Sequence, residues 1–200
     1  MKATYLKYIL DFKRPSGTSR GVLTQKETWF IVLEKDDKKG IGECGVLRGL
    51  SIDDRPDYEE KLQWVCENIH LGKDTLWEAL LEFPSIQFGV ETAFLSLVSK
   101  TPFELFESEF TSGQKSMLIN GLVWMGEEAF MKQQIEEKLA QGFTCIKLKI
   151  GAIDFDKELG LLRFIRQHFD EKTIEIRVDA NGAFGSNDAL YKLKQLSGYQ

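Results

Sequence analysis

From Lys115 onward, the chain alternates strand-like and helix-like segments at a nearly constant interval. We predict strands at 116–122, 143–150 and 173–179, helices over about 127–140 and 155–169, and a further helix that begins at Ser186 or Asn187. The expected strand ends, near Asn120, Lys149 and Asp179, are 29 and 30 residues apart. Each interval has the length of one strand–helix unit, so the strands should form a parallel sheet. Ligands of such sheets bind beyond the carboxyl ends of the strands.

The first hundred residues follow a different pattern, in which strands come before helices. We predict strands at 4–12, 28–34 and 41–46, helices at 57–68, 75–81 and 86–98, and irregular segments at 13–26 and 47–56. Strands followed by helices are typical of an α+β domain. The expected organisation is an α+β domain over 1–100, a linker over 101–114, and the first three units of a (β/α) barrel over 115–200.

Composition narrows the classes of partner. The 200 residues are 42% hydrophobic and 28% charged, and the net charge of −5 is spread along the chain. This pattern argues against a nucleic-acid or anionic-membrane surface and favours a small-molecule partner, with a homo-oligomer left open. The start shows no signal-peptide pattern and the chain has no apolar run of membrane-spanning length, so we expect a cytoplasmic protein. The cysteines, Cys44, Cys66 and Cys145, are widely spaced and are expected to be reduced.

The stretch TCIKLKIG, residues 144–151, holds two lysines on one face of a predicted strand. Lys147 and Lys149 point to one side and the intervening aliphatic residues to the other. Either the lysines form a solvated strand face or they face a reaction site. Because helices cover the outside of a parallel sheet, the second interpretation gains weight. A neighbouring positive charge favours the neutral amine, which can accept a proton.

Asp179 is the carboxylate at the next predicted strand end, before the turn AlaAsnGly. It either binds a hard cation such as Mg²⁺ or serves as a turn or helix-capping group. A metal ion together with a lysine base is the chemistry of removing a proton next to a carboxylate.

The segments KLKIG at 147–151 and RVDANG at 177–182 resemble the KxK and DAN motifs of the enolase superfamily, in its muconate-lactonizing subgroup. GIGEC at 40–44 and the helices after it resemble the capping domain of that superfamily. The resemblance covers the whole chain. It implies a Mg²⁺ cofactor, a small-molecule carboxylate substrate, and a site that two capping-domain loops, here 13–26 and 47–56, would close.

Within the subgroup, FKRPSGTSRG at 12–21 and INGLVWMG at 119–126 are most similar to the o-succinylbenzoate synthase family of menaquinone synthesis. That similarity implies a carbon–oxygen lyase that dehydrates 2-succinyl-6-hydroxy-2,4-cyclohexadiene-1-carboxylate through α-proton removal and a metal-stabilised enediolate. It makes Lys149 the acid/base, Lys147 its electrostatic neighbour, and Asp179 a Mg²⁺ ligand. It makes Asn181 a polar group that either supports the metal ligand or faces the substrate. The implied candidates for binding the substrate's carboxylates are Arg14, Ser16, Thr18 and Arg20.

The chain departs from the family pattern in its length. A closed barrel needs about 250 residues, and two further carboxylate ligands and a second lysine of the family have no counterpart before Gln200. We therefore expect the front part of a longer enzyme, which alone neither binds Mg²⁺ tightly nor turns over substrate. Two alternatives stay open: a dipeptide epimerase or other subgroup enzyme that uses the same Lys149, and a non-catalytic truncated relative.

Overall fold

The computed structural model describes residues 1–18 and 21–199. Two compact units are present: an N-terminal unit of Met1–Ser16 and Leu23–Ser116, and a C-terminal unit that includes Met117–Gln200. The N-terminal unit contains most of β1 (Lys2–Thr18) and of β2 (Gly21–Lys35), together with β3 (Lys38–Cys44), α1 (Tyr58–Glu67), a 3₁₀ turn (Ile69–Leu71), α2 (Lys73–Ala79) and α3 (Pro84–Val98). The C-terminal unit contains β4 (Gly121–Val123), α4 (Glu128–Ala140), β5 (Cys145–Lys149), α5 (Phe155–His168), β6 (Glu175–Asp179) and α6 (Ala189–Ser197).

The N-terminal sheet has the strand order β1-β2-β3, and β2 and β3 form an antiparallel hairpin. Lys35 pairs with Lys38, so Asp36 and Asp37 alone make the turn. Their φ angles are 51° and 63°. Two central residues with positive φ match the turn type that suits the twist of a hairpin, and aspartate tolerates this backbone region.

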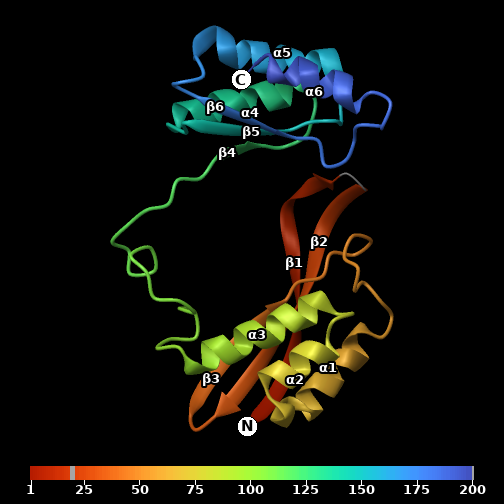
Figure 1. The fold of residues 1–200 in the computed structure, drawn as a ribbon, viewed down its shortest axis with the longest axis vertical. Coiled ribbons are helices and arrows are strands. Elements are labelled where there is room, and N and C mark those ends of the chain that lie inside the picture. Colours follow the sequence, from red (N-terminus) through yellow and green to blue (C-terminus); the bar gives the residue numbers. More distant parts are fainter. Residues whose placement is uncertain (19–20, 200) are drawn as a thin grey trace. The chain divides into compact units, whose positions relative to one another are not determined.

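Helix α3 packs on β3 to form the centre of the N-terminal core (Figure 1). The close approach depends on glycine, because a Cβ at Gly42 would collide with the carbonyl oxygen of Gly89 in α3. Large apolar side chains of the sheet and helices fill the surrounding core, including Trp29, Ile31, Leu33, Leu62, Leu76 and Ile86. The expected α+β arrangement of this part of the chain is confirmed.

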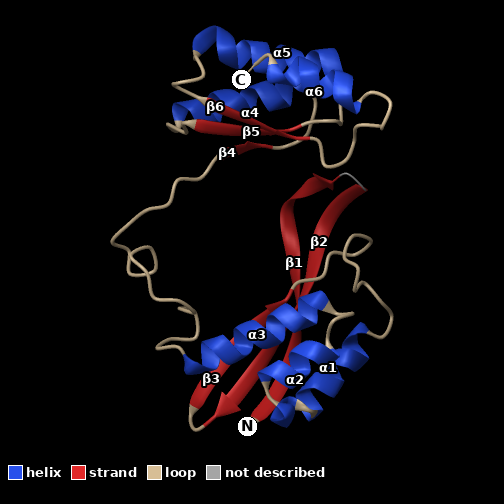
Figure 2. Ribbon diagram, in the orientation of Figure 1, coloured by secondary structure: helices blue, strands red, loops and turns tan. Residues whose placement is uncertain are grey.

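The segment 13–26 is not the irregular piece that the sequence pattern predicts. β1 continues to Thr18 and β2 begins at Gly21, so described residues of this segment extend a long pair of strands (Figure 2). Pro15 and the nearby glycines indicate a loop from sequence. However, β1 is an edge strand, and an edge strand tolerates proline because one side of its backbone has no partner.

The C-terminal sheet is parallel, with the order β4-β5-β6. Its three helices lie on one side of it (Figure 2). Ile146 and Leu148 of β5 are fully buried in the same core as Met131 and Ile135 of α4 and Ile165 of α5. The predicted strand–helix repeat and parallel sheet are therefore confirmed.

The first strand of this unit is shorter than predicted. The sequence predicts a strand at 116–122 that ends near Asn120, whereas β4 comprises only Gly121–Val123. Met117, Leu118 and Ile119 are exposed and lie outside the sheet. Their apolar character is compatible with a strand, but a strand is defined by a paired neighbour, and these residues have none in the described sheet. Within the described part of the chain, no helix is long and apolar enough to cross a membrane.

Candidate active site

Adjacent strands place Lys147, Lys149 and Asp179 on one face of the C-terminal sheet. In the register of β5 and β6, Lys147 lies beside Arg177 and Lys149 beside Asp179. The alternate residues of β5, Ile146 and Leu148, point to the opposite face, into the core beneath the helices. The period of two along the strand therefore separates apolar packing from polar chemistry, as expected.

Both lysines contact one oxygen of Asp179. The Nζ atom of Lys147 is 3.0 Å and that of Lys149 is 3.2 Å from Asp179 Oδ2. The side chains are partly buried, with exposed fractions of 32% for Lys147, 21% for Lys149 and 28% for Asp179. A plain solvated face would leave the two ammonium groups apart in water. Here they converge on one carboxylate at the carboxyl end of the strands.

The two lysines hold Asp179 in its ionised form. A hydrogen bond from Lys147, helped by the backbone N–H of Asn181 and by Lys149, lowers the pKa of Asp179 to about 2. The carboxylate is therefore anionic at neutral pH. An anionic oxygen at this position is available to a cation.

Asn181 completes the cluster through its backbone and its side chain. Its φ angle is 48°, in the left-handed region that asparagine tolerates. In this conformation its N–H donates to Asp179 Oδ1 at 3.0 Å, while its Oδ1 accepts from Lys149 Nζ at 2.8 Å. The turn after β6 thus fixes the carboxylate and gives Lys149 a second oxygen partner.

Asp179 and Asn181 offer the hard oxygen atoms that Mg²⁺ prefers. Over residues 1–18 and 21–199, however, no group of three or more His, Cys, Asp or Glu side chains is placed to hold a metal ion. The donor chemistry of this cluster thus fits magnesium, and it includes one carboxylate, that of Asp179. Tight binding of a divalent ion requires ligands in addition to these.

The predicted substrate-carboxylate residues belong to the segment 13–26. Arg14, Ser16 and Thr18 lie on β1, where the Arg14 side chain is exposed and that of Ser16 is partly buried. Arg20 lies outside the described residues. Their proposed contact with substrate stays a prediction.

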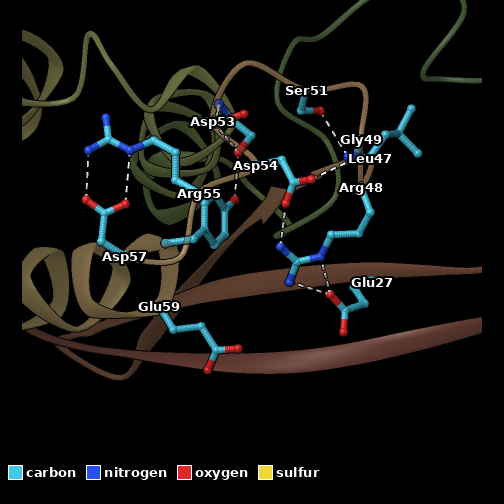
Figure 3. Close-up of polar contacts among 12 residues, drawn as sticks. Glu27, Leu47, Arg48, Gly49, Ser51, Asp53, Asp54, Arg55, Asp57 and Glu59 are labelled. Atoms are coloured by element: carbon cyan, nitrogen blue, oxygen red, sulfur yellow. Dashed lines mark hydrogen bonds and ion pairs between the residues drawn. The ribbon is translucent and has the colours of Figure 1, made fainter.

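The second predicted loop, 47–56, is irregular as expected and is held by ion pairs (Figure 3). The Arg48 guanidinium donates to Glu27 at 2.7 Å and to Asp54 at 2.6 Å. The other oxygen of Asp54 accepts the N–H of Gly49 at 2.6 Å. Arg48 also lies over the ring of Trp29, 5.5 Å from its centroid. These contacts give the loop a defined conformation.

Asp53 anchors the same loop from within the N-terminal core. The side chain is 1% exposed, and its Oδ2 accepts hydrogen bonds from the N–H and the Oγ of Ser85, at 2.8 and 2.6 Å. Ser85 lies in the first turn of α3, where N–H groups lack helical partners and a negative charge is favoured. Asp53 therefore caps α3 although it lies 32 positions before Ser85 in the sequence. A search for capping residues directly before the helix does not find it.

We predict that Asp53→Ala lowers the free energy of unfolding of the N-terminal unit by about 1–3 kcal/mol, because buried donors lose a charged acceptor. Urea unfolding followed by tryptophan fluorescence measures the change. Asp57→Ala serves as the control, since Asp57 makes an exposed ion pair with Arg55 (Figure 3) and should cost less. Equal losses in the two variants would contradict the capping role.

The three cysteines are free thiols outside the lysine–aspartate cluster. Burial raises the pKa of all three, that of Cys66 to about 11. We predict that, at pH 8, iodoacetamide labels Cys66 about ten-fold more slowly in the folded protein than in the protein unfolded by urea. The raised pKa lowers the fraction of thiolate, and the higher nucleophilicity of that thiolate offsets part of the loss. The rate should rise with pH up to about 11. Mass spectrometry gives the rate, and equal labelling in the folded and unfolded protein would refute the shift.

Sequence reasoning missed Glu158, a buried carboxylate of α5 that accepts the N–H of Gly151 just after β5. Its position in α5 lies on the same stripe as Phe155, Leu159 and Leu162. An acidic residue within an apolar helix stripe is the signal that identifies it from sequence.

Comparison with known proteins matches both halves of the chain to one superfamily. Residues 1–97 match the family model "MenC, N-terminal domain", and residues 130–200 match "Enolase C-terminal domain-like". A curated o-succinylbenzoate synthase of Desulfotalea psychrophila is 42% identical over 98% of this chain and 62% of its own length.

Solved structures show the same fold. The crystal structure of MenC from Desulfotalea psychrophila matches all of this chain and 62% of its own, with a TM-score of 0.81 at 36% identity. The o-succinylbenzoate synthase of Thermosynechococcus elongatus, solved with Mg in its active site, matches all of this chain and 58% of its own, with a TM-score of 0.73 at 18% identity. The chain thus spans about three fifths of the length of these relatives.

Proposed function

This chain belongs to the enolase superfamily and resembles its o-succinylbenzoate synthases, and from that membership we propose that it forms part of a Mg²⁺-dependent dehydratase. The substrate would be 2-succinyl-6-hydroxy-2,4-cyclohexadiene-1-carboxylate and the product o-succinylbenzoate, in menaquinone synthesis. The observation that supports this function best is the convergence of two lysines on one strand-end carboxylate, with Lys149 Nζ 3.2 Å from Asp179 Oδ2.

Lys149 would act as the acid/base. In its neutral form, its amine takes the proton from the carbon next to the substrate carboxylate. The resulting ammonium then protonates the hydroxyl on the neighbouring carbon, the C–O bond breaks, and water leaves as the ring becomes aromatic. One residue thus carries the proton from carbon to the leaving oxygen, and positioned groups of this kind contribute about 10² to 10⁴-fold to a rate.

Lys147 and Asp179 would set the charge around Lys149. Lys147 shares Asp179 Oδ2 with Lys149 and would place a second positive charge beside the acid/base. Asp179 would supply one oxygen ligand to Mg²⁺, with other ligands from the rest of the protein. When bound, Mg²⁺ supplies positive charge that stabilises developing negative charge on the substrate carboxylate.

Asn181 would orient Lys149. Its Oδ1 accepts a hydrogen bond from the lysine, which directs the Nζ atom along the turn after β6. An amide oxygen accepts this bond without adding charge, so it fixes the direction of the ammonium and leaves its proton available for transfer.

Assays of two substrates on the full-length protein test this proposal. We expect dehydration of the cyclohexadiene carboxylate with a kcat/KM in the usual enzyme range of about 10⁴ to 10⁸ M⁻¹s⁻¹. We expect much slower epimerisation of a dipeptide such as L-Ala-L-Glu. Efficient epimerisation without dehydration would replace the dehydratase assignment by an epimerase that uses the same lysine. Inactivity toward both would favour a non-catalytic relative.

A further inference from the structure

Glu158 is a buried carboxylate whose contacts lead directly to the end of β5. Its side chain is 1% exposed. Its Oε1 accepts a hydrogen bond from the N–H of Gly151 at 2.6 Å, and the N–H groups of Ala152 and Ile153 also interact with the carboxylate. A side chain of α5 thus accepts the backbone N–H of Gly151 and anchors the segment that follows β5.

This segment is where the two site loops meet. Gly151 comes two residues after Lys149, and the residue between them, Ile150, donates its N–H to the carbonyl of Asp179 at 3.0 Å. Gly151 has a φ angle of +94°, and a Cβ there would collide with Ala183 in the turn after β6. A shift of Gly151 would therefore be transmitted to both Lys149 and the Asp179 turn.

Packing alone does not explain an acid at this position. The second oxygen, Oε2, is buried without a hydrogen-bond partner among the residues that the structure describes. Burial also raises the pKa of Glu158, and the positive charge of Lys192 offsets only part of this effect. Since apolar side chains such as Leu159 and Leu162 surround it, a leucine would fill the site without desolvating a polar group. A leucine, however, would give the N–H of Gly151 no acceptor.

We propose that Glu158 is a positioning residue of the reaction centre: by accepting the backbone N–H of Gly151, it holds the end of β5 so that Lys149 reaches Asp179 and Asn181. This inference rests on the proposed function, because it assigns Glu158 an effect on proton transfer at Lys149. Glu158 itself touches neither substrate nor Lys149 in this account. It acts through the backbone.

Three variants of the full-length protein test the proposal. Glu158→Gln keeps an oxygen acceptor at the same reach and should retain kcat within about three-fold. Glu158→Leu keeps the volume but removes the acceptor, and kcat should fall about 10²-fold while KM changes less than about three-fold. Glu158→Asp withdraws the carboxylate by one methylene group, so kcat should fall at least about ten-fold. Circular dichroism establishes that each variant is folded.

The pattern across the variants separates positioning from general stability. Full kcat in Glu158→Leu, or an equal loss in Glu158→Gln and Glu158→Leu, would overturn the proposal. If Glu158→Leu does not fold, the comparison of Glu158→Asp with Glu158→Gln decides, and equal kcat in these two would overturn it.

An inactive wild-type protein would contradict the proposed function rather than the contact of Glu158 with the loop. In that case, the rate of amide hydrogen exchange at Gly151 tests the contact of Glu158 with the loop after β5. It should be at least about ten-fold faster in Glu158→Leu, or in Glu158→Asp if that is the folded variant, than in Glu158→Gln. Equal exchange in the compared variants would overturn the role of Glu158.

Discussion

Replacing Lys149 with alanine is expected to lower kcat for dehydration by about 10² to 10⁴-fold, since this is the contribution of a positioned acid/base group. The full-length protein is assayed for o-succinylbenzoate formation at saturating Mg²⁺. KM should change little, because the role proposed for Lys149 is proton transfer and not binding of the substrate carboxylate. The partner of Lys149 in the cluster, Asp179, remains paired with Lys147 in this variant.

Two further variants sharpen the interpretation of this loss. Lys149→Arg keeps the positive charge but not a group that gives up its proton at neutral pH, so it should be nearly as inactive as the alanine variant. Lys172→Ala, in the turn between α5 and β6, should retain wild-type kcat. A loss of only a few-fold in Lys149→Ala would remove Lys149 from the acid/base role.

The second large effect is expected for Asp179→Asn. The substitution replaces an anionic oxygen by a neutral one of the same size, so the Mg²⁺ concentration for half-maximal activity should rise by at least about 10 to 100-fold. At low Mg²⁺ the activity should fall by the same factor. Titration of activity with MgCl₂ measures both quantities.

A matched control is Asp170→Asn, which changes an aspartate that hydrogen-bonds to Thr173 before β6. Its Mg²⁺ dependence should equal that of the wild type. An unchanged Mg²⁺ requirement in Asp179→Asn would exclude Asp179 as a ligand. A loss of kcat that excess Mg²⁺ does not restore would instead indicate that the ion pairs with the lysines dominate its role.

Much of the C-terminal unit follows from local sequence pattern. The predicted helix at 155–169 appears as α5, and Asp154 accepts the N–H of Asp156 at its start, as an N-cap does. The alternation in TCIKLKIG, residues 144–151, correctly assigns Ile146 and Leu148 to the core. These features depend on residues close in sequence, and the periods of helix and strand encode them directly.

Features that depend on distant residues were not predictable in the same way. β1 extends through Pro15 because β2 pairs with it, although proline by itself favours a loop. The stretch at 116–120 has strand-like residues but no partner in the described sheet. The cap that Asp53 gives to α3 joins residues 32 positions apart. In each case a tertiary neighbour decides the outcome.

In the candidate site, too, some features follow from local sequence and others depend on tertiary contacts. The sequence placed Lys149 and Asp179 at neighbouring strand ends, and the register of β5 and β6 pairs them directly. It did not predict that Asn181 adopts a positive φ and accepts a bond from Lys149, nor that Glu158 binds the loop after β5. Turn conformation and buried side-chain contacts decide these details.

The most direct test of the account is the Mg²⁺-dependent formation of o-succinylbenzoate by the full-length protein, followed by ultraviolet absorbance beside the Lys149→Ala variant. We predict turnover by the wild type at about 1 to 10³ s⁻¹, its loss on chelation of the metal, and its loss in the variant. Wild-type protein that forms no more product with Mg²⁺ than the Lys149→Ala variant would contradict it.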